Sequence, residues 1–299
     1  MDLSLMITPA NLIAALLTLI PLLGAAFFTT DVMRGVRRLP LWARLLSPAA
    51  LCLPYALVAC GAGVFRWGWL ALYAVLPMAI AGLLDGARGA DSGPGGQRGN
   101  WRDFVVLAAL GLAVDLRWFE GAWPAHLAIF NKMLLLDAGI HGFIFVRQLA
   151  GVGFDLRLRL RDAAVGLREL GFYTPIALAL GLSLGFLHVH RAWPGLGSIA
   201  GAWGFTFFFI AVPEELFFRG WLQNLLERRI GRMPALFVTA ILFGLSHFNK
   251  RAVLFNWRYV LLAAVAGVFY GRAWRQERRV GASAITHATV DAIWSLWLR

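Results

Sequence analysis

The chain has 299 residues, of which 60% are hydrophobic and only 15% are charged. A soluble globular domain is about half apolar and about a quarter charged, so this composition excludes a disordered or collagenous chain and argues against an ordinary cytosolic enzyme. The formal net charge is +12, and the arginines that produce it stand between apolar runs. Arginine in such positions orients membrane helices, which makes nucleic acid an unexpected partner.

Ten apolar segments follow one another along the chain. They lie at residues 5–30, 42–65, 67–84, 104–119, 123–146, 172–189, 196–226, 233–248, 258–273 and 281–298. A helix needs about 20 residues to cross the hydrocarbon core of a bilayer. Leu3–Thr30 and Ala192–Pro213 contain no charged residue and reach this length. The sequence therefore predicts an all-α, polytopic membrane protein with about 8–10 transmembrane helices.

Arginines gather after alternate segments, as in Arg34, Arg37 and Arg38 or in Arg275, Arg278 and Arg279. Positively charged loops stay on the cytoplasmic side of a membrane. This pattern predicts that both termini lie outside. The excess of arginine over lysine is typical of bacterial sequences, so the expected location is a bacterial inner membrane.

The stretch Gly151–Arg168 divides the chain into two regions. It contains Leu-Arg-Leu-Arg-Leu-Arg, whose alternation predicts a short strand or an interfacial stretch beside anionic lipid. Residues 1–150 are interpreted as transmembrane helices that form an accessory, substrate-selecting region. Residues 151–299 are expected to form the functional core, with motifs between residues 213 and 291.

One segment of the first region carries four polar residues, Asn131, Lys132, Asp137 and His141. Asp137 and His141 are spaced as neighbours on one helix face. Two interpretations remain open for the group. It forms a self-satisfied polar patch between helices, or it serves as a substrate-docking surface or ion pathway.

The densest group of charges within an apolar region is Pro213-Glu214-Glu215-Leu-Phe-Phe-Arg219. Glu215 and Arg219 are four residues apart, so they share a helix face and are expected to pair. Glu214 points about 100° away around the helix. A carboxylate placed there inside the membrane suits the role of a general base.

Three further polar residues lie in later apolar segments. His247 ends the run Phe243-Gly-Leu-Ser-His, and His287 and Asp291 are one turn apart in the last segment. Counted from the inside ends of their segments at about 1.5 Å per residue, Glu214, His247 and His287 lie roughly 10–21 Å deep. These depths predict that the side chains meet in one intramembrane site.

The three motifs Glu-Glu-x-x-x-Arg, Phe-x-x-x-His and His-x-x-x-Asp occur in this order over roughly the last hundred residues. In this respect the chain resembles the CPBP family of intramembrane proteases, which comprises type II CAAX prenyl proteases and bacteriocin-processing relatives. The resemblance implies a glutamate-type endopeptidase acting on a membrane-associated protein or peptide. It implies that Glu214 and His247 activate water, that His287 and Asp291 stabilise the oxyanion, and that Glu215 and Arg219 give structural support.

Asp291 departs from the asparagine that prenyl-protease members often carry. An ionised aspartate repels an oxyanion, so Asp291 is expected to be protonated, to orient His287, or to bind a metal. No cofactor is expected, but a divalent metal held by Glu214, His247, His287 and Asp291 remains an alternative. The His-Glu-x-x-His motif of zinc proteases is absent from the sequence.

Other functional classes remain open as alternatives. Gly181-Leu-Ser183-Leu-Gly185 matches the pattern of a serine nucleophile, although it lacks the strand that precedes such a serine in soluble hydrolases. Polar residues in both regions would also suit a transporter. A non-catalytic scaffold or immunity protein is the third alternative.

Overall fold

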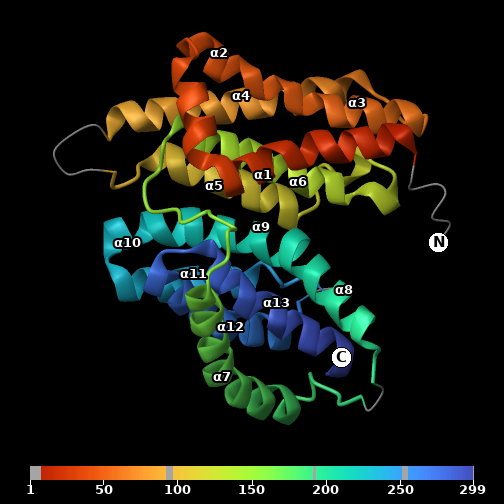
Figure 1. Cartoon of the computed structure of the whole chain (residues 1–299), viewed down its shortest axis with the longest axis vertical. Coiled ribbons are helices and arrows are strands. Elements are labelled where there is room, and N and C mark those ends of the chain that lie inside the picture. Colours follow the sequence, from red (N-terminus) through yellow and green to blue (C-terminus); the bar gives the residue numbers. More distant parts are fainter. Residues whose placement is uncertain (1–7, 92–96, 191–192, 251–254, 299) are drawn as a thin grey trace. The chain divides into compact units, whose positions relative to one another are not determined.

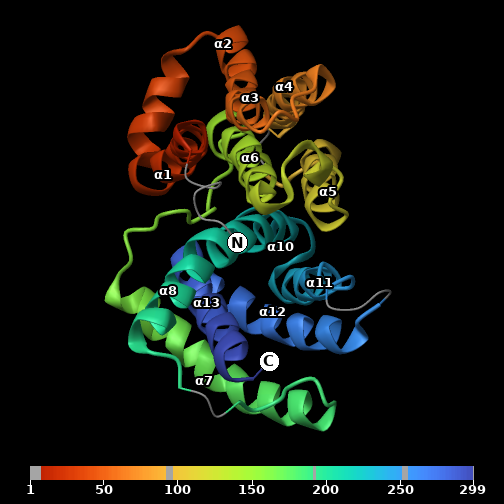
Figure 2. The same cartoon turned by 90° about the vertical axis from the view of Figure 1, so that its right-hand side faces the viewer.

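In a computed structural model of the chain, the structure describes residues 8–91, 97–190, 193–250 and 255–298. All regular elements within these ranges are helices. Figures 1 and 2 show them coloured along the sequence. The chain divides into two compact units, Met1–Ala150 and Gly151–Arg299. The prediction of an all-α, polytopic membrane protein is confirmed.

Within its described residues, the first unit contains six α-helices. Asn100 and Asp103 form a reciprocal capping box at the start of α5, and the Thr8 hydroxyl accepts from the Asn11 amide at the start of α1. Such caps satisfy amide groups that the first turn of a helix leaves without a partner. The elements are α1 (Pro9–Arg38), α2 (Leu41–Leu46), α3 (Cys52–Gly61), α4 (Trp67–Ala90), α5 (Trp101–Asp115) and α6 (Ile129–Gly139), which continues as a π-helix, Ile140–Val146.

The second unit is built around two helices, α12 and α13. Helix α12 packs against α7, α11 and α13, and α13 also packs against α7 and α8. The two views show α7, α12 and α13 as neighbours (Figures 1 and 2). The elements are α7 (Leu160–Ser183), α8 (Leu196–Thr206), α9 (Val212–Glu215), α10 (Asn224–Ile230), α11 (Arg232–Leu245), α12 (Trp257–Glu277) and α13 (Val280–Trp297).

Each of the ten predicted apolar segments coincides with helical structure. Five stretches of the described residues are long and apolar enough to cross a membrane: Pro9–Arg38, Leu41–Gly61, Trp67–Ala90, Ala125–Val146 and Leu196–Ile230. This number is smaller than the 8–10 helices expected from the sequence. Among the other helices, α11 has only 14 residues and α12 carries four charged residues, Arg258, Arg272, Arg275 and Glu277.

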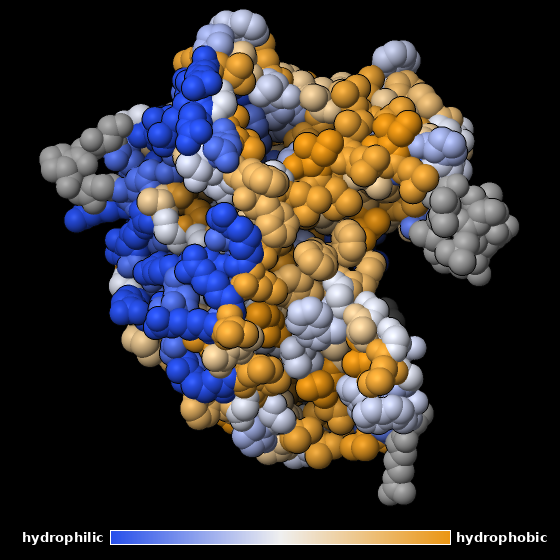
Figure 3. Space-filling model, in the orientation of Figure 1, coloured by the Kyte–Doolittle hydropathy of each residue, from blue (hydrophilic) through white to orange (hydrophobic). Residues whose placement is uncertain are grey.

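Large apolar side chains cover much of the outer surface. Leu16 and Ile20 of α1 are more than 60% exposed, and Phe237 and Ile241 of α11 are at least half exposed. On the face in Figure 3, hydrophobic residues form broad areas, and within the second unit hydrophilic residues gather beside α10 and α11. Continuous apolar surface of this kind needs a partner such as the bilayer interior.

The segment Gly151–Arg159 is irregular, so the predicted short strand is wrong. Its backbone groups bond to the corner between α12 and α13 and make no strand ladder. Trp274 Nε1 donates to the Val152 carbonyl, and the Val280 amide donates to the Gly153 carbonyl. Leu160 then starts α7, because the Asp162 carboxylate accepts from the Arg159 amide and caps the first turn.

Arg279 fastens this segment to the start of α13. Its guanidinium donates to the carboxylates of Asp155 and Asp162 and to the carbonyls of Asp155 and Arg157. Burial opposes ionisation of Asp155, but hydrogen bonds from Arg157 and Arg279 outweigh it and lower the pKa of Asp155 to about 2. The ionised network therefore persists at neutral pH and holds the segment in place.

Replacing Gly153 with alanine should destabilise the second unit by about 2–4 kcal/mol. Gly153 has φ +73°, and a Cβ there would lie 1.8 Å from the Arg278 carbonyl oxygen. Gly185 is the matched control, because it has φ +62° and a Cβ added there would meet nothing within 4 Å. The Tm of each variant is measured by thermal unfolding in detergent. The Gly185 variant reports the effect of backbone strain alone, and the Gly153 variant reports strain together with the steric clash. Equal shifts in Tm would contradict this account.

Candidate active site

The paired glutamates lie in the middle of one helical stretch, Leu196–Ile230. The stretch is not a uniform α-helix, since π-helical turns Phe207–Ala211 and Leu216–Gln223 flank the four-residue α9. Pro213, in the first turn of α9, has no amide hydrogen to donate to the preceding turn. Because π turns change the angular spacing of side chains, they affect where the glutamates point, and such turns often mark functional sites.

Glu215 and Arg219 form a buried ion pair, as their spacing predicts. Arg219 Nε lies 3.1 Å from Glu215 Oε2, and both side chains are fully buried. The guanidinium carbon of Arg219 also lies 5.0 Å from the ring centre of Phe243 and 5.8 Å from that of Tyr270. Cation–π contacts of this kind partly replace the lost hydration of the guanidinium.

His287 occupies a fixed orientation beside this pair. Its Nδ1 lies 2.9 Å from Glu215 Oε1. Its ring stacks on Tyr270 at 4.6 Å between centroids and meets Phe243 edge-on at 5.5 Å. Since Nδ1 faces Glu215, Nε2 is the nitrogen that points to the rest of the site. Glu215 thus links the first motif to the last one, a contact that sequence spacing does not reveal.

Glu214 and Asp291 are the accessible carboxylates of the group. Their side chains are 27% and 32% exposed, whereas Glu215 is fully buried. Glu214 Oε2 lies 3.8 Å and Asp291 Oδ2 lies 3.6 Å from the same atom, Nε2 of His287. Two partly exposed carboxylates therefore converge on one imidazole nitrogen.

His247 lies just beyond the end of α11 and is buried. Its Nδ1 lies 2.9 Å from the Phe243 carbonyl oxygen and 3.1 Å from Ser246 Oγ, which itself donates to that carbonyl. A carbonyl oxygen only accepts, so Nδ1 is the nitrogen that donates and Nε2 keeps its lone pair. The rings of Phe243 and Tyr259 each lie 4.9 Å from the imidazole and hold it between them.

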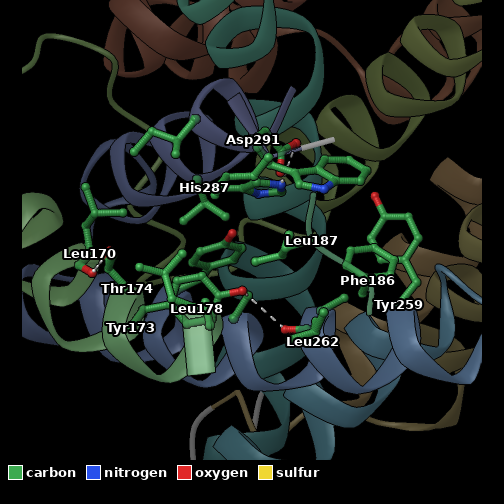
Figure 4. Close-up of a pocket in the computed structure, with 18 of the residues that line it drawn as sticks. Leu170, Tyr173, Thr174, Leu178, Phe186, Leu187, Tyr259, Leu262, His287 and Asp291 are labelled. Atoms are coloured by element: carbon green, nitrogen blue, oxygen red, sulfur yellow. Dashed lines mark hydrogen bonds and ion pairs between the residues drawn. The ribbon is translucent and has the colours of Figure 1, made fainter. Parts of the chain in front are cut away.

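A cavity of about 100 Å³ adjoins the histidines. Its polar lining includes His247, His287 and Asp291, and most of the remaining wall is apolar side chains of α7, α12 and α13. Figure 4 shows His287 and Asp291 on one side, with Leu170, Tyr173 and Thr174 of α7 at another wall. An apolar cavity with a few polar groups at one side is the usual form of a substrate site.

Lys250 is a site residue that the sequence analysis did not identify. The sequence places it only in an outer loop between two apolar segments. In the structure its Nζ lies 4.0 Å from Glu214 Oε1. No local pattern connects the two residues, because the contact depends on how the loop after α11 folds back toward α9.

Ser183 does not have the surroundings of a nucleophile. It ends α7, and its hydroxyl donates to the Leu180 carbonyl one turn earlier. Gly181 packs closely on Leu187, since an added Cβ would lie 2.4 Å from that side chain, and Gly185 adopts φ +62° after the helix. The glycines of the Gly-x-Ser-x-Gly pattern therefore serve the packing and the end of α7.

The polar residues of the first unit make separate local contacts. Tyr73 donates to Asn131 Oδ1 at 2.7 Å, and His141 Nε2 lies 2.8 Å from the Arg44 carbonyl oxygen. Asp137 is fully buried and Lys132 is exposed. The hydrogen bonds of Asn131 and His141 agree with a polar patch between helices. The spacing of Asp137 and His141 suggested that these two side chains would be neighbours, but the partner of His141 is a backbone carbonyl.

The alternative of a metal site requires ligands around one point. Among the residues that the structure describes, no group of three or more His, Cys, Asp or Glu side chains is placed to hold a metal ion. Zinc would need nitrogen and oxygen ligands at about 2.0–2.2 Å. Glu214 and Asp291 instead contact Nε2 of His287, at 3.8 and 3.6 Å. Chelation is the experiment that decides metal dependence.

Comparison with known proteins identifies the family of the site-bearing segment. Residues 196–293 match the family model of type II CAAX prenyl endopeptidases, Rce1-like. No curated protein and no solved structure matches the chain. The matched segment runs from α8 into α13 and contains Glu214, His247, His287 and Asp291. The resemblance predicted from the three motifs is thereby confirmed for residues 196–293, which are similar to the Rce1-like type II CAAX prenyl endopeptidases.

Proposed function

We propose that this chain is an intramembrane endopeptidase that hydrolyses a peptide bond of a membrane-associated protein or peptide. The observation that carries the proposal is the convergence of Glu214, Asp291 and His287 Nε2, beside a cavity lined by His247. This arrangement supplies a base for water and a donor for negative charge in an apolar setting. Those are the two requirements of peptide hydrolysis by activated water.

Glu214 is the general base in this mechanism. Its carboxylate is partly exposed and can accept a proton from a water molecule, while Glu215 is occupied by Arg219 and His287. His247 supplies the lone pair of Nε2, which accepts the second hydrogen bond of that water and fixes its direction. Holding water in one orientation lowers the entropic cost of attack.

His287 stabilises the oxyanion from Nε2. Its ring contacts Glu215 at Nδ1 and faces Glu214 and Asp291 at Nε2. Three carboxylates around one imidazole favour the cationic form of His287, which has a hydrogen on each nitrogen. In this arrangement Asp291 orients His287 and offsets its charge. Of the three roles considered for Asp291, orientation of His287 agrees best with the 3.6 Å contact.

The reaction needs only water and the peptide. The water oxygen bonds to the carbonyl carbon as Glu214 takes a water proton, and the carbonyl oxygen becomes an oxyanion beside His287. The carbon–nitrogen bond then breaks, and the proton on Glu214 passes to the leaving amine. The products are a carboxylic acid and an amine, which become a carboxylate and an ammonium when the remaining water proton passes from one to the other, and Glu214 is again ionised.

The cavity indicates an apolar group beside the scissile bond. Its volume of about 100 Å³ is smaller than the 150 Å³ of an engineered cavity that admits benzene, so it suits one aliphatic side chain. The aliphatic wall from α7 and α12 would exclude charged side chains, because burial of an unpaired charge is costly.

The first unit, residues 1–150, is in this proposal an accessory region that selects or presents the substrate.

The basic end of the second unit supports the proposed membrane orientation. Arg275 and Arg278 both pair with Glu227 of α10, and Arg161 of α7 pairs with Glu277 of α12. These helix ends therefore meet, and positive charge favours the cytoplasmic side. The end of α13 then lies outside, in keeping with an inner-membrane protein of a bacterium whose termini face outward.

Hydrolysis is tested with the purified chain in phospholipid vesicles and a pool of internally quenched peptides. The peptides carry either leucine or aspartate beside the scissile bond, with and without a farnesylated cysteine near the carboxyl end. Leucine peptides should be cleaved at least about tenfold faster than aspartate peptides. Mass spectrometry in ¹⁸O water should find one ¹⁸O in the new carboxylate. Uptake of intact peptides without cleavage would favour a transporter.

A further inference from the structure

A cation, Lys250, lies close to Glu214, the proposed general base. Lys250 Nζ lies 4.0 Å from Glu214 Oε1, and its charge also acts on His247. The side chain of Lys250 is 38% exposed and that of Glu214 is 27% exposed, so the contact lies at the accessible edge of the site. Lys250 is one of only two lysines in the chain, the other being Lys132.

The backbone of Lys250 is tied to the site on both sides. Its amide donates to the His247 carbonyl at 3.2 Å, and its carbonyl accepts from Asn256 Nδ2 at 3.1 Å. Asn256 also accepts from the Tyr259 amide and so caps the start of α12. The backbone position of Lys250 is therefore coupled to His247 and to the start of α12.

The charges around Glu214 give Lys250 a specific role. Glu215 and Arg219 neutralise each other on the same helix, and from α13 His287 contacts both Asp291 and Glu214. Lys250 is the cation that approaches Glu214 from the loop after α11. A positive charge there favours the ionised carboxylate of Glu214 and disfavours a second positive charge on His247.

We propose that Lys250 is a positioning residue of the peptidase reaction, which holds Glu214 ionised and directed at the water while keeping His247 neutral. This inference rests on the proposed function, since it assigns a partner to the base of that reaction. It does not place Lys250 on the substrate. Lys250 therefore influences the rate of the chemical step and leaves substrate binding nearly unchanged.

The test compares Lys250→Met, Lys250→Arg and Lys132→Met in the vesicle assay with the leucine peptide. K250M should lower kcat about tenfold or more with KM within about twofold of the wild type, because a unit charge about 4 Å from the base is lost. K250R should keep most of the activity, since it restores the charge. K132M removes the other lysine, which is exposed in the first unit, and should leave kcat unchanged, because the proposed chemical step uses residues of the second unit alone.

A chemical restoration separates charge from folding. In a background without Cys52 and Cys60, the two free cysteines, K250C should be as slow as K250M. Alkylation with 2-bromoethylamine then rebuilds an ammonium group at residue 250 and should recover most of kcat. Recovery would be direct support, because alkylation of the folded protein changes only this side chain.

Several outcomes would overturn the role of Lys250 alone. Wild-type kcat in K250M, equal loss in K250R and K250M, or a raised KM with unchanged kcat would each contradict a positioning charge. E214Q, measured in the same assay, keeps these results distinct from failure of the proposed function. If E214Q is inactive and K250M is fully active, the peptidase stands and the role of Lys250 falls.

Discussion

Replacement of Glu214 with glutamine should lower the rate of peptide hydrolysis at least about 100-fold, since an amide cannot take the proton from water. The fold should survive, because the Glu214 side chain is 27% exposed and the buried pair in this helix is made by Glu215 and Arg219. The measurement is kcat/KM for the leucine peptide in vesicles, with thermal unfolding as the check on folding.

The matched control is Glu120→Gln, which removes a carboxylate from the first unit, outside the candidate site. Its kcat/KM should equal that of the wild type. The wild-type protein is also assayed with a chelator, to test the metal alternative. If the chelator abolishes activity and added zinc restores that activity, the chain is a metalloprotease. Full activity in E214Q would remove the catalytic assignment altogether.

Replacement of Arg219 with methionine should cost about 3–5 kcal/mol of folding free energy, because it leaves the Glu215 carboxylate buried without its cation. Both side chains are fully buried, and the guanidinium also packs on Phe243 and Tyr270. The expected result is a large fall in Tm and a low yield of folded protein. Thermal unfolding in detergent, followed by circular dichroism, measures it.

Two comparisons make this result specific to burial. Asp31→Asn breaks the ion pair with Arg34, whose side chains are 69% and 61% exposed, and should change Tm little. Glu215→Leu combined with R219M should recover stability relative to R219M, since the buried carboxylate that R219M leaves without its cation is then removed as well. The double variant should remain inactive, because His287 Nδ1 loses its carboxylate. A wild-type Tm in R219M would contradict the account.

Local features of this protein follow well from sequence. The apolar segments coincide with helices. A helix that lies in a bilayer or in a helical core needs a run of apolar residues, and the length of such a run can be read directly from the sequence. The pair Glu215–Arg219 also follows, since a four-residue spacing places both side chains on one face of any helix. The three motifs likewise identify the family of residues 196–293.

Where local pattern was ambiguous, the sequence misled. The alternating leucines and arginines after Gly151 have the period of a strand, yet they lie in an irregular segment and the first turn of α7. The reason is tertiary, because the donors that satisfy the segment come from Trp274, Arg279 and Val280 at the α12–α13 corner. Periodicity contains no information about such distant donors.

The sequence by itself determined the helical class, the positions of the apolar segments, the family and the set of polar side chains at compatible depths. Only the tertiary structure decided which atoms meet. His287 contacts Glu215 across 72 positions, and Lys250 reaches Glu214 from a loop that carries no motif. Helical spacing governs contacts within a few residues, whereas contacts between helices depend on the packing of every side chain between them.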